Sequence, residues 1–273
     1  MNHDLPATDS FSDYREYPAP LSLAGHLLCF WTQSITSGGV YRHRVLPDAC
    51  LDLVFINDEL PVVVGPWTSA FTADLPAGAK IVGARWHPGR APALLGLPAM
   101  ELVNQSVPLH CVWNRATNLQ FASVTDQPDL AARRTALEAA LLTRVGHVAP
   151  VDLAVDAGIR WLANHPQGRV EQMSRIVGLS HRHLQRRFSA AVGYGPKMFQ
   201  SVLRFQRLLN LASARSTRHT LADFAVEAGY ADQAHMTREV RRFSGSSPGT
   251  TLRCAESTLR LSNFFDSSVE PKV

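Results

Sequence analysis

The sequence predicts an α+β protein, in which a β-rich, sandwich- or barrel-like N-terminal domain is followed by an all-α domain. Short runs rich in Val, Ile, Leu and aromatic residues, separated by Pro, Gly, Asp and Asn, fill residues 14–113. After residue 126 the apolar residues recur at helical spacing instead. The charge also changes along the chain. Residues 166–256 hold 14 Lys and Arg against 6 Asp and Glu, a net +8, and the remainder carries −4.

Strands are expected in the first part at five runs: LLCFWTQ, YRHRVL, LDLVFI, PVVVG and KIVGARW. Two of them, Leu51–Ile56 and Pro61–Gly65, are separated by the turn-like stretch NDEL, which predicts a hairpin. The segment Ala91–Leu102 lacks alternation and is expected to be helical around its prolines. Short strands with regular turn signals are typical of an antiparallel sandwich or barrel.

Two amphipathic helices mark the change of character, at Asp129–Val145 and Asp152–His165. Beyond them the chain reads as helical to Glu256, with Gly and Pro only at intervals. We therefore expect a β-rich domain at residues 12–125, a helical linker at 126–150, a helical domain at 151–256 and a flexible tail at 257–273.

The composition, with 45% hydrophobic and 18% charged residues, is typical of a soluble globular protein. The sequence has no apolar run long enough to span a bilayer and no signal peptide at its N-terminus, so a cytoplasmic location is expected. Cys29, Cys50, Cys111 and Cys254 lie far apart without a CxxC pair. We expect neither a zinc site nor a disulfide framework, and no metal or cofactor.

An internal repeat organises the helical part. An offset of 52 residues aligns Leu184 with Met236, Phe188 with Val240, Gly193 with Gly245 and Pro196 with Pro248. Each copy reads as a short helix, a turn with glycine (Gly178 or Gly229) and a second helix that Ser180 or Asp232 can cap. This pattern predicts two helix-turn-helix units.

The outward faces of the two second helices carry residues suited to DNA. Arg reads guanine and Gln reads adenine by paired hydrogen bonds in the major groove. In the first of these helices two arginines and a glutamine share one side, and in the second a glutamine, a threonine and an arginine do so. The expected base readers are Arg182, Gln185, Arg186, Gln233, Thr237 and Arg238. Nearer the flanks, where phosphates would lie, are His181, Arg187, Arg241 and Arg242.

These motifs resemble the DNA-binding domain of the AraC/XylS family of bacterial transcriptional regulators. The first unit, GLSHRHLQRRFSAAVGYGPKMF followed by LRFQRLLNLA, is similar to the family's turn, recognition helix and linking helix. The second matches the family's signature at Ala225, Gly229, Tyr230, His235, Arg241, Gly245 and Pro248. It departs at Met236 and Val240, where the family usually has Phe, and at Ala234, which offers DNA no hydrogen-bonding group.

The resemblance implies a sequence-specific regulator with two helix-turn-helix units joined by a long helix at about Met198–Arg215. Its recognition helices would enter successive major grooves, about 34 Å apart, on double-stranded promoter or operator DNA. RNA polymerase is an expected partner. In this family the N-terminal domain commonly senses a small molecule, dimerises, or both. The segments Val45–Phe55, Gly65–Thr68 and Gly83–Leu109 resemble a β-rich domain of one subgroup of such regulators.

Candidate chemistry in the N-terminal half leaves two interpretations open. Asp48, Asp52 and Arg85 could meet an effector or form a structural ion pair. Trp31, Trp67 and Trp86 could line a pocket, although core packing is favoured. The histidines in this half (His26, His43, His87 and His110) lack the His-x-His pattern of a cupin metal site and are expected to be surface or hydrogen-bonded residues.

Two other functions compete with a sequence-specific regulator. A bifunctional enzyme and regulator of the alkyl-transfer repair type would need a zinc-held cysteine cluster, against which the scattered cysteines argue. A non-specific DNA-binding protein would show similar affinity for any duplex. We expect no enzymatic activity. The operator, the effector, the sign of regulation and the oligomeric state, including a homodimer held by the N-terminal half, are left open by the sequence.

Overall fold

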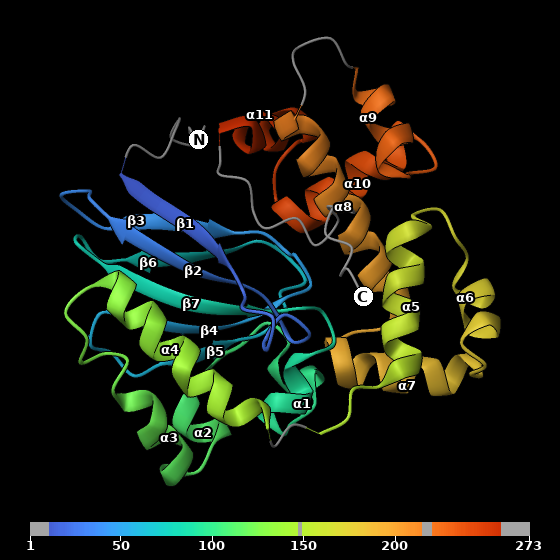
Figure 1. Cartoon of the computed structure of the whole chain (residues 1–273). Helices are drawn as coiled ribbons and strands as arrows, with labels where there is room; N and C mark the ends of the chain where they lie inside the picture. The colour runs from blue at the N-terminus through green and yellow to red at the C-terminus, as the bar shows by residue number, and fades with distance from the viewer. Residues whose placement is uncertain (1–10, 147–148, 215–219, 258–273) are drawn as a thin grey trace.

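The computed structural model describes residues 11–146, 149–214 and 220–257. A β-rich part and a helical part lie side by side, with the strands on the left of Figure 1, α5 to α10 towards the right and α11 at the top centre. This arrangement confirms the predicted fold class of a β-rich N-terminal domain followed by helices. No helix among the described residues is both long and apolar enough to cross a membrane.

The main sheet is antiparallel and has six strands. Its order is β1 (Ser12–Pro18), β2 (Leu27–Ile35), β7 (Lys80–Trp86), β4 (Leu51–Ile56), β5 (Val62–Val64) and β8 (Ser106–Pro108). A separate two-stranded sheet pairs β3 (Tyr41–Val45) with β6 (Phe71–Leu75). The predicted hairpin is confirmed as β4 and β5, with Asp52 opposite Val64. Among the described residues the sheets stay open rather than closing into a barrel.

Both faces of the main sheet are buried. Phe30, Leu53 and Trp86 point to one face, where they share a core with the helices that cover it. These are α1 (Ala91–Leu95), the 3-10 helix η1 (Ala99–Leu102), α2 (Leu109–Val112), α3 (Arg115–Ala122) and α4 (Leu130–Val145). On the other face Trp31 and Val54 pack with Leu75 of the small sheet.

Helix α4 belongs to the core of the β-rich part. Its N-cap Asp129 accepts a hydrogen bond from the backbone N–H of Ala132 at 2.8 Å. Leu137, Ala140 and Leu141 then point at the sheet and are buried. The segment expected to be a helical linker is therefore helical, as its period predicts, and it packs as a layer over β2 and β7 (Figure 1).

The helical part consists of seven helices among the described residues. They are α5 (Leu153–Asn164), α6 (Val170–Ile176), α7 (His181–Val192), α8 (Pro196–Ala214), α9 (Leu221–Ala228), α10 (Gln233–Ser244) and α11 (Pro248–Ser257). Ser180 caps α7 and Asp232 caps α10, as predicted. Gly193 and Gly245 end these two helices in the left-handed conformation, with φ of 102° and 68°, which glycine adopts without strain.

The two parts share an extensive interface. Ala49 of the N-terminal part lies in the same apolar core as α5 to α11. Gln206 of α8 donates to the carbonyl of Pro47 at 2.6 Å. The N–H of Ala70 donates to the carbonyl of Phe243 in α10 at 2.7 Å. The N-terminal part therefore contacts the long helix and the end of the second repeat at once.

We predict that Gly83→Ala destabilises the N-terminal sheet. A Cβ at Gly83 would lie 2.3 Å from the ring of Trp31 on the neighbouring strand, so the indole and its hydrogen bond to Asp52 would shift. Overpacking of this kind costs about 1–3 kcal/mol of the free energy of unfolding, which urea denaturation measures. Gly25→Ala is the matched control, because a Cβ there meets nothing within 4 Å. Equal stability of the two variants would contradict the packing described.

Candidate nucleic-acid interface

The first helix-turn-helix unit consists of α6 and α7. Helix α6 ends at Ile176, and Gly178 takes the left-handed conformation with φ of 66° in the turn. Within the unit the Ser174 hydroxyl donates to the carbonyl of Leu179, so the small residue in α6 holds the turn. Leu184 and Phe188 of α7 are fully buried. The predicted inward and outward faces of α7 are therefore confirmed.

The second unit, α9 and α10, repeats this plan, with four residues between its helices as in the first unit. Thr220 and Asp223 form a capping box at the start of α9. Gly229 ends that helix with φ of 90°, and a Cβ there would lie 2.8 Å from Pro166. Met236 and Val240 are fully buried although they replace the aromatic residues usual in the resembled family. The second unit therefore keeps its core despite these departures.

The structure places the six predicted base readers on two separate helices. Arg182 and Arg186 of α7 and Gln233 and Arg238 of α10 are exposed. Gln185 is exposed too, but its amide lies so close to Gly195 that a Cβ there would clash with it, at 2.0 Å. Thr237 is half-buried and donates its hydroxyl to the carbonyl of Gln233 at 2.8 Å. Gln185 and Thr237 would have to change rotamer or share these contacts to read a base.

The four predicted phosphate neighbours differ in their surroundings. His181 and Arg241 are exposed. Arg242 is exposed as well, with its guanidinium 5.4 Å from the Phe243 ring and a contact to the sulfur of Met198. Arg187 is half-buried and donates from Nε and Nη2 to the two carboxylate oxygens of Asp152, both at 2.6 Å. The guanidinium of Arg187, which was expected at the DNA backbone, is therefore engaged in a bidentate ion pair with Asp152.

Asp152 has two roles at the start of α5. Its carboxylate accepts hydrogen bonds from the N–H groups of Ala154 and Val155, which caps the helix. Burial alone would raise the pKa of Asp152, but the hydrogen bonds from Arg187 and these amides outweigh burial and lower it. The hydrogen bond to Asp152 raises the pKa of Arg187 in turn. The pair ties α7 to α5.

A corresponding network holds α10 to α8. Arg204 of α8 lies 3.4 Å from the carboxylate of Glu239 in α10, and the Ser201 hydroxyl donates to the same carboxylate at 2.6 Å. His235 is 3.6 Å from it. Sequence reasoning missed these contacts and the Asp152–Arg187 pair. The signal that could have revealed them is an oppositely charged residue 35 positions upstream in each unit.

The charged residues singled out in the N-terminal half form a buried cluster. Asp52 on β4 faces Arg85 on β7, with Nε 3.1 Å from the carboxylate, and also accepts from the Trp31 indole at 2.7 Å. Burial raises the pKa of Asp52 although Arg85 opposes it. Asp48 and Glu16 each lie 3.8 Å from Arg85. With side chains of Asp52 and Arg85 only 12% and 11% exposed, the structural ion-pair interpretation is favoured.

The other candidate residues of this half are spread over its two cores and its surface. Trp31 and Trp86 are buried in the two cores, and Trp67 stacks on Phe71 at 4.2 Å, an arrangement in keeping with packing. Burial lowers the pKa of His26 and of His87. His110 and Cys111 are exposed, His43 is half-buried, and Cys29 and Cys50 are buried. Among the described residues, no three His, Cys, Asp or Glu side chains gather as metal ligands.

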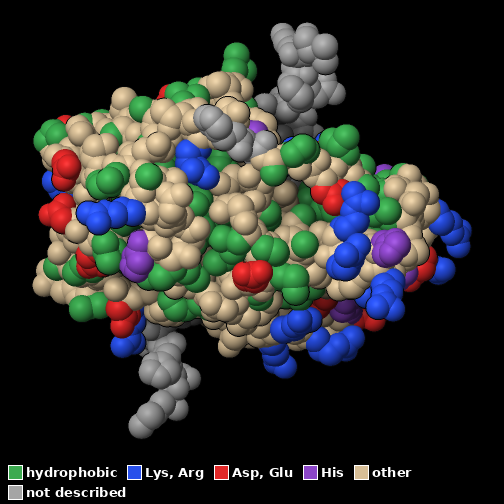
Figure 2. All heavy atoms as spheres, turned by 90° about the horizontal axis from the view of Figure 1, so that it is seen from below, with side chains coloured by type: hydrophobic (Ala, Val, Ile, Leu, Met, Phe, Trp, Pro, Cys, Tyr) green, Lys and Arg blue, Asp and Glu red, His purple; other side chains and the backbone are tan. Residues whose placement is uncertain are grey.

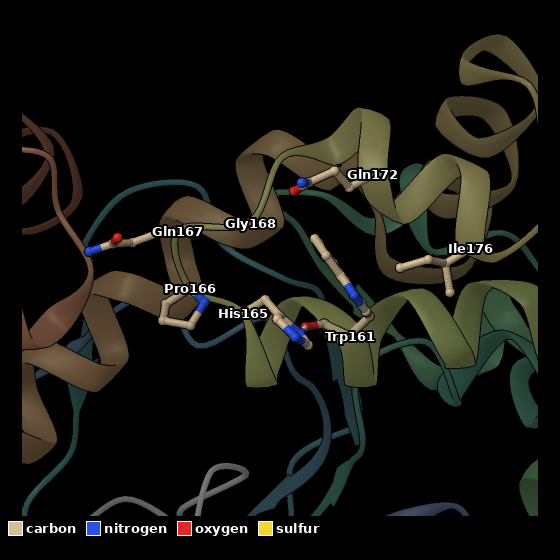
Figure 3. A pocket seen from close by; sticks show the side chains of 7 residues that line it. All are labelled: Trp161, His165, Pro166, Gln167, Gly168, Gln172 and Ile176. Carbon is tan, nitrogen blue, oxygen red and sulfur yellow. Dashed lines mark hydrogen bonds between the residues drawn. The ribbon is translucent and has the colours of Figure 1, made fainter.

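Two hollows lie away from these residues. One of about 530 Å³ lies between α5 and α6, and its wall carries no Lys, Arg, Asp or Glu. It is lined by Trp161, His165, Pro166, Gln167, Gly168, Gln172 and Ile176 (Figure 3). In it the Trp161 ring stacks on His165 at 4.6 Å. The other, of about 270 Å³, lies in the N-terminal part between the β4–β5 turn and α3. Neither hollow includes a predicted base reader or phosphate neighbour.

Positive charge gathers at the helical end of the molecule. In Figure 2, which views the molecule from below, Lys and Arg side chains cluster over the region of α5, α6 and α7, and the β-rich end carries both signs. Exposed members of this group include Arg169, Arg175, Arg182 and Arg186. A basic face that contains a recognition-type helix is the electrostatic footprint expected of a DNA-binding domain.

Two protein-family models match the chain, one in each part. Residues 173–253 match the model of a helix-turn-helix domain. Residues 15–108 match the model of a domain of unknown function, DUF6597. No curated protein matches the chain.

Solved structures similar to this chain include several regulators. A probable AraC family transcriptional regulator from Rhodopseudomonas palustris CGA009 is 26% identical over 38% of this chain and 98% of its own, with a TM-score of 0.34. ToxT from Vibrio cholerae is 9% identical over 89% of this chain and 98% of its own, with a TM-score of 0.43. The xylose-binding transcription activator XylR is 19% identical over 46% of this chain, with a TM-score of 0.35, and the match spans 40% of XylR.

We predict that Asp152→Asn lowers stability by about 1 kcal/mol at neutral pH, because the amide keeps a cap acceptor but loses the attraction to Arg187. The folded-state pKa of Asp152 is lowered, so its contribution is complete above the ordinary aspartate pKa, about 3.9, and is lost as the pH falls through the lowered value. The difference in urea unfolding between wild type and variant should therefore be full at pH 7 and shrink as the pH falls below the ordinary aspartate pKa of about 3.9. A difference that stays constant over this range would contradict the pair.

Proposed function

We propose that this chain is a DNA-binding transcriptional regulator of the AraC type, whose helix-turn-helix domain at residues 173–253 uses α7 and α10 as its two recognition helices. The observation that carries this proposal is the duplication itself. Each of the two helices has a side-chain N-cap, buried apolar residues at matching positions and a left-handed glycine at its end, and each presents arginine, with glutamine or threonine, on the outward face. In successive major grooves of one duplex they would read two short sites about one helical turn apart.

The residues divide into roles by their exposure. We propose Arg182 and Arg186 of α7 and Gln233 and Arg238 of α10 as the primary base readers, because their side chains are exposed on the outward faces. Gln185 and Thr237 are proposed as secondary readers, which would change rotamer or share their contacts within the domain to reach a base. His181, Arg241 and Arg242 are proposed phosphate contacts. Arg187 is proposed as a positioning residue, in place of its expected phosphate contact.

The N-terminal domain is proposed to respond to a small molecule and to pass the response to both recognition helices. Arg44 of β3 donates to the carbonyl of Ser244 and to the Ser246 hydroxyl at the end of α10. At the other unit, Arg90 pairs with the buried Asp156 of α5, and Gly193 at the end of α7 packs on Pro66 and Val103. A change of shape in the N-terminal domain would therefore reach both units through direct contacts.

The remaining expectations are kept as proposals. We propose residues 151–256 as the DNA-binding domain and residues 12–125, with α4 of the 126–150 segment packed on them, as the effector domain; the expected tail at 257–273 lies outside the described residues apart from Ser257. The protein would act by binding rather than catalysis, in the cytoplasm, where its DNA target lies. RNA polymerase is the proposed partner at the promoter, and a homodimer would form through the N-terminal domain.

In-vitro selection of DNA from a random pool tests this function with the full chain. The expected result is a bipartite site, and large discrimination against unrelated duplexes at moderate salt. Symmetric half-sites would additionally identify a dimer. Similar affinity for every sequence would support the non-specific alternative and overturn the proposal. Stoichiometric zinc by elemental analysis would revive the alkyl-transfer alternative.

Substitution of Arg186 tests the assignment of base readers. Arg186→Ala should cost about 1–3 kcal/mol on the selected site and relax the base preference at one position, since a bidentate contact to guanine is lost. Arg241→Ala is the contrasting variant, because a phosphate contact should weaken binding to all sequences alike and reduce the salt dependence. An equal loss for Arg186→Ala on every sequence would show that Arg186 is not a base reader.

Substitution of Arg44 tests the contact between the domains. Arg44→Ala removes hydrogen bonds to the last turn of α10, so amides of this turn and of Ala70 should exchange hydrogen faster. Hydrogen exchange followed by mass spectrometry measures this change. Arg42→Ala is the control, because Arg42 lies on the same strand with its side chain 79% exposed, paired with Asp74. Unchanged exchange in α10 of the Arg44 variant would contradict the coupling route.

A further inference from the structure

The ion pairs Asp152–Arg187 and Arg204–Glu239 involve the same position of the two proposed recognition helices. Arg187 follows Arg186 and precedes the buried Phe188, and Glu239 follows Arg238 and precedes the buried Val240. The two positions differ by the 52 residues that separate the two units. Both side chains therefore leave their helix at the same angle from the apolar stripe, one residue from a proposed base reader.

The partners of this position also correspond. Each lies 35 residues upstream, on the helix that precedes the unit: Asp152 at the start of α5 and Arg204 in α8. The signs of the charges are reversed, however. In the first unit the recognition helix carries the cation and the preceding helix the anion, and in the second unit the recognition helix carries the anion.

We propose that these ion pairs are positioning contacts that fix the rotation of the two recognition helices, and that their opposite polarity confines each recognition helix to its own preceding helix. This inference rests on the proposed function, in which α7 and α10 read DNA. Neither Arg187 nor Glu239 touches a base. Each acts through the neighbouring arginine.

The rotation follows from the direction of the contacts. Leu184 and Phe188 hold α7 along one stripe, about which a helix can still roll. The bidentate contact of Arg187 with Asp152 adds a second line of attachment to one side of this stripe. In α10, Glu239 does the same through Arg204 and Ser201, whose side chains are mostly buried. With two lines of attachment, each helix is held in one rotation about its own axis. This rotation sets the direction of Arg186 in α7 and of Arg238 in α10.

The opposite polarity of the two ion pairs determines which preceding helix each recognition helix docks on, and the apolar residues do not. Both units bury apolar side chains at matching positions, so the apolar pattern alone would let either recognition helix dock on either preceding helix. In the exchanged arrangement Arg187 would meet Arg204, and Glu239 would meet Asp152. Like charges at these partly buried positions would be unfavourable, and the exchange would be rejected by repulsion as well as by lost attraction.

Charge exchange in the second unit tests the positioning role. Arg204→Glu and Glu239→Arg alone each place like charges opposite one another, and binding of the full chain to its selected site should fall by roughly 10-fold or more. Base preference should relax at the positions that α10 reads. Combining the two changes restores the attraction, and both affinity and base preference should return towards wild type. A combined variant no better than the single ones would overturn the positioning role.

Milder variants keep the test decisive if the charge reversals do not fold. Glu239→Gln and Arg187→Gln remove one charge but keep hydrogen-bonding groups. They should relax base preference at the positions of their own unit only, and leave the salt dependence of binding unchanged. A salt dependence reduced by about one ion in Arg187→Gln would assign Arg187 to a phosphate instead and overturn its positioning role.

The combined variant Arg204→Glu, Glu239→Arg also tests the polarity. It keeps an ion pair in each unit but gives both units the same polarity. After refolding from urea, titration with the selected site should show a smaller DNA-active fraction than wild type, while the active molecules bind normally. An active fraction equal to that of wild type would overturn the polarity role. A wild-type protein that selects no site would instead refute the proposed function on which the inference rests.

Discussion

Burial of helix α8 on nearly all sides is the constraint on which the helical part depends. Phe199, Leu203 and Phe205 are among its buried residues, and the helix packs against α5, α7, α9, α10 and α11. Two short helix-turn-helix units could not bury enough surface to be stable alone, so they share this helix as a common core. Because α8 is one continuous helix, it also fixes the distance between the two units.

The N-terminal part adds to this core rather than merely preceding it. Ala49 enters the apolar cluster of the helices, and Gln206 in the middle of α8 donates to Pro47. Charged contacts flank this apolar centre, with Arg90 on Asp156 at one unit and Arg44 at the end of α10. The interface therefore joins the β-rich domain to α5, to α8 and to the end of α10.

Much of this organisation follows from local patterns in the sequence. The caps Ser180 and Asp232 and the turn glycines Gly178 and Gly229 obey rules that act within a few residues, and all four were predicted. The open form of the sheet, the packing of α4 on it and the Asp152–Arg187 pair depend on residues far apart in the chain. A helical period shows that α4 has an apolar face but not what that face meets. One arginine alone likewise gives no sign of its acid partner, because the 35-residue spacing becomes a signal only when the two units are compared.

Methylation interference on the selected DNA site tests most directly whether two recognition helices act together. Methylated guanines should block binding in two clusters about 10 base pairs apart, on one face of the duplex, because α7 and α10 would enter successive major grooves. A single cluster, or interference spread evenly along the duplex, would contradict an account in which α8 holds two DNA-reading helices at a fixed spacing.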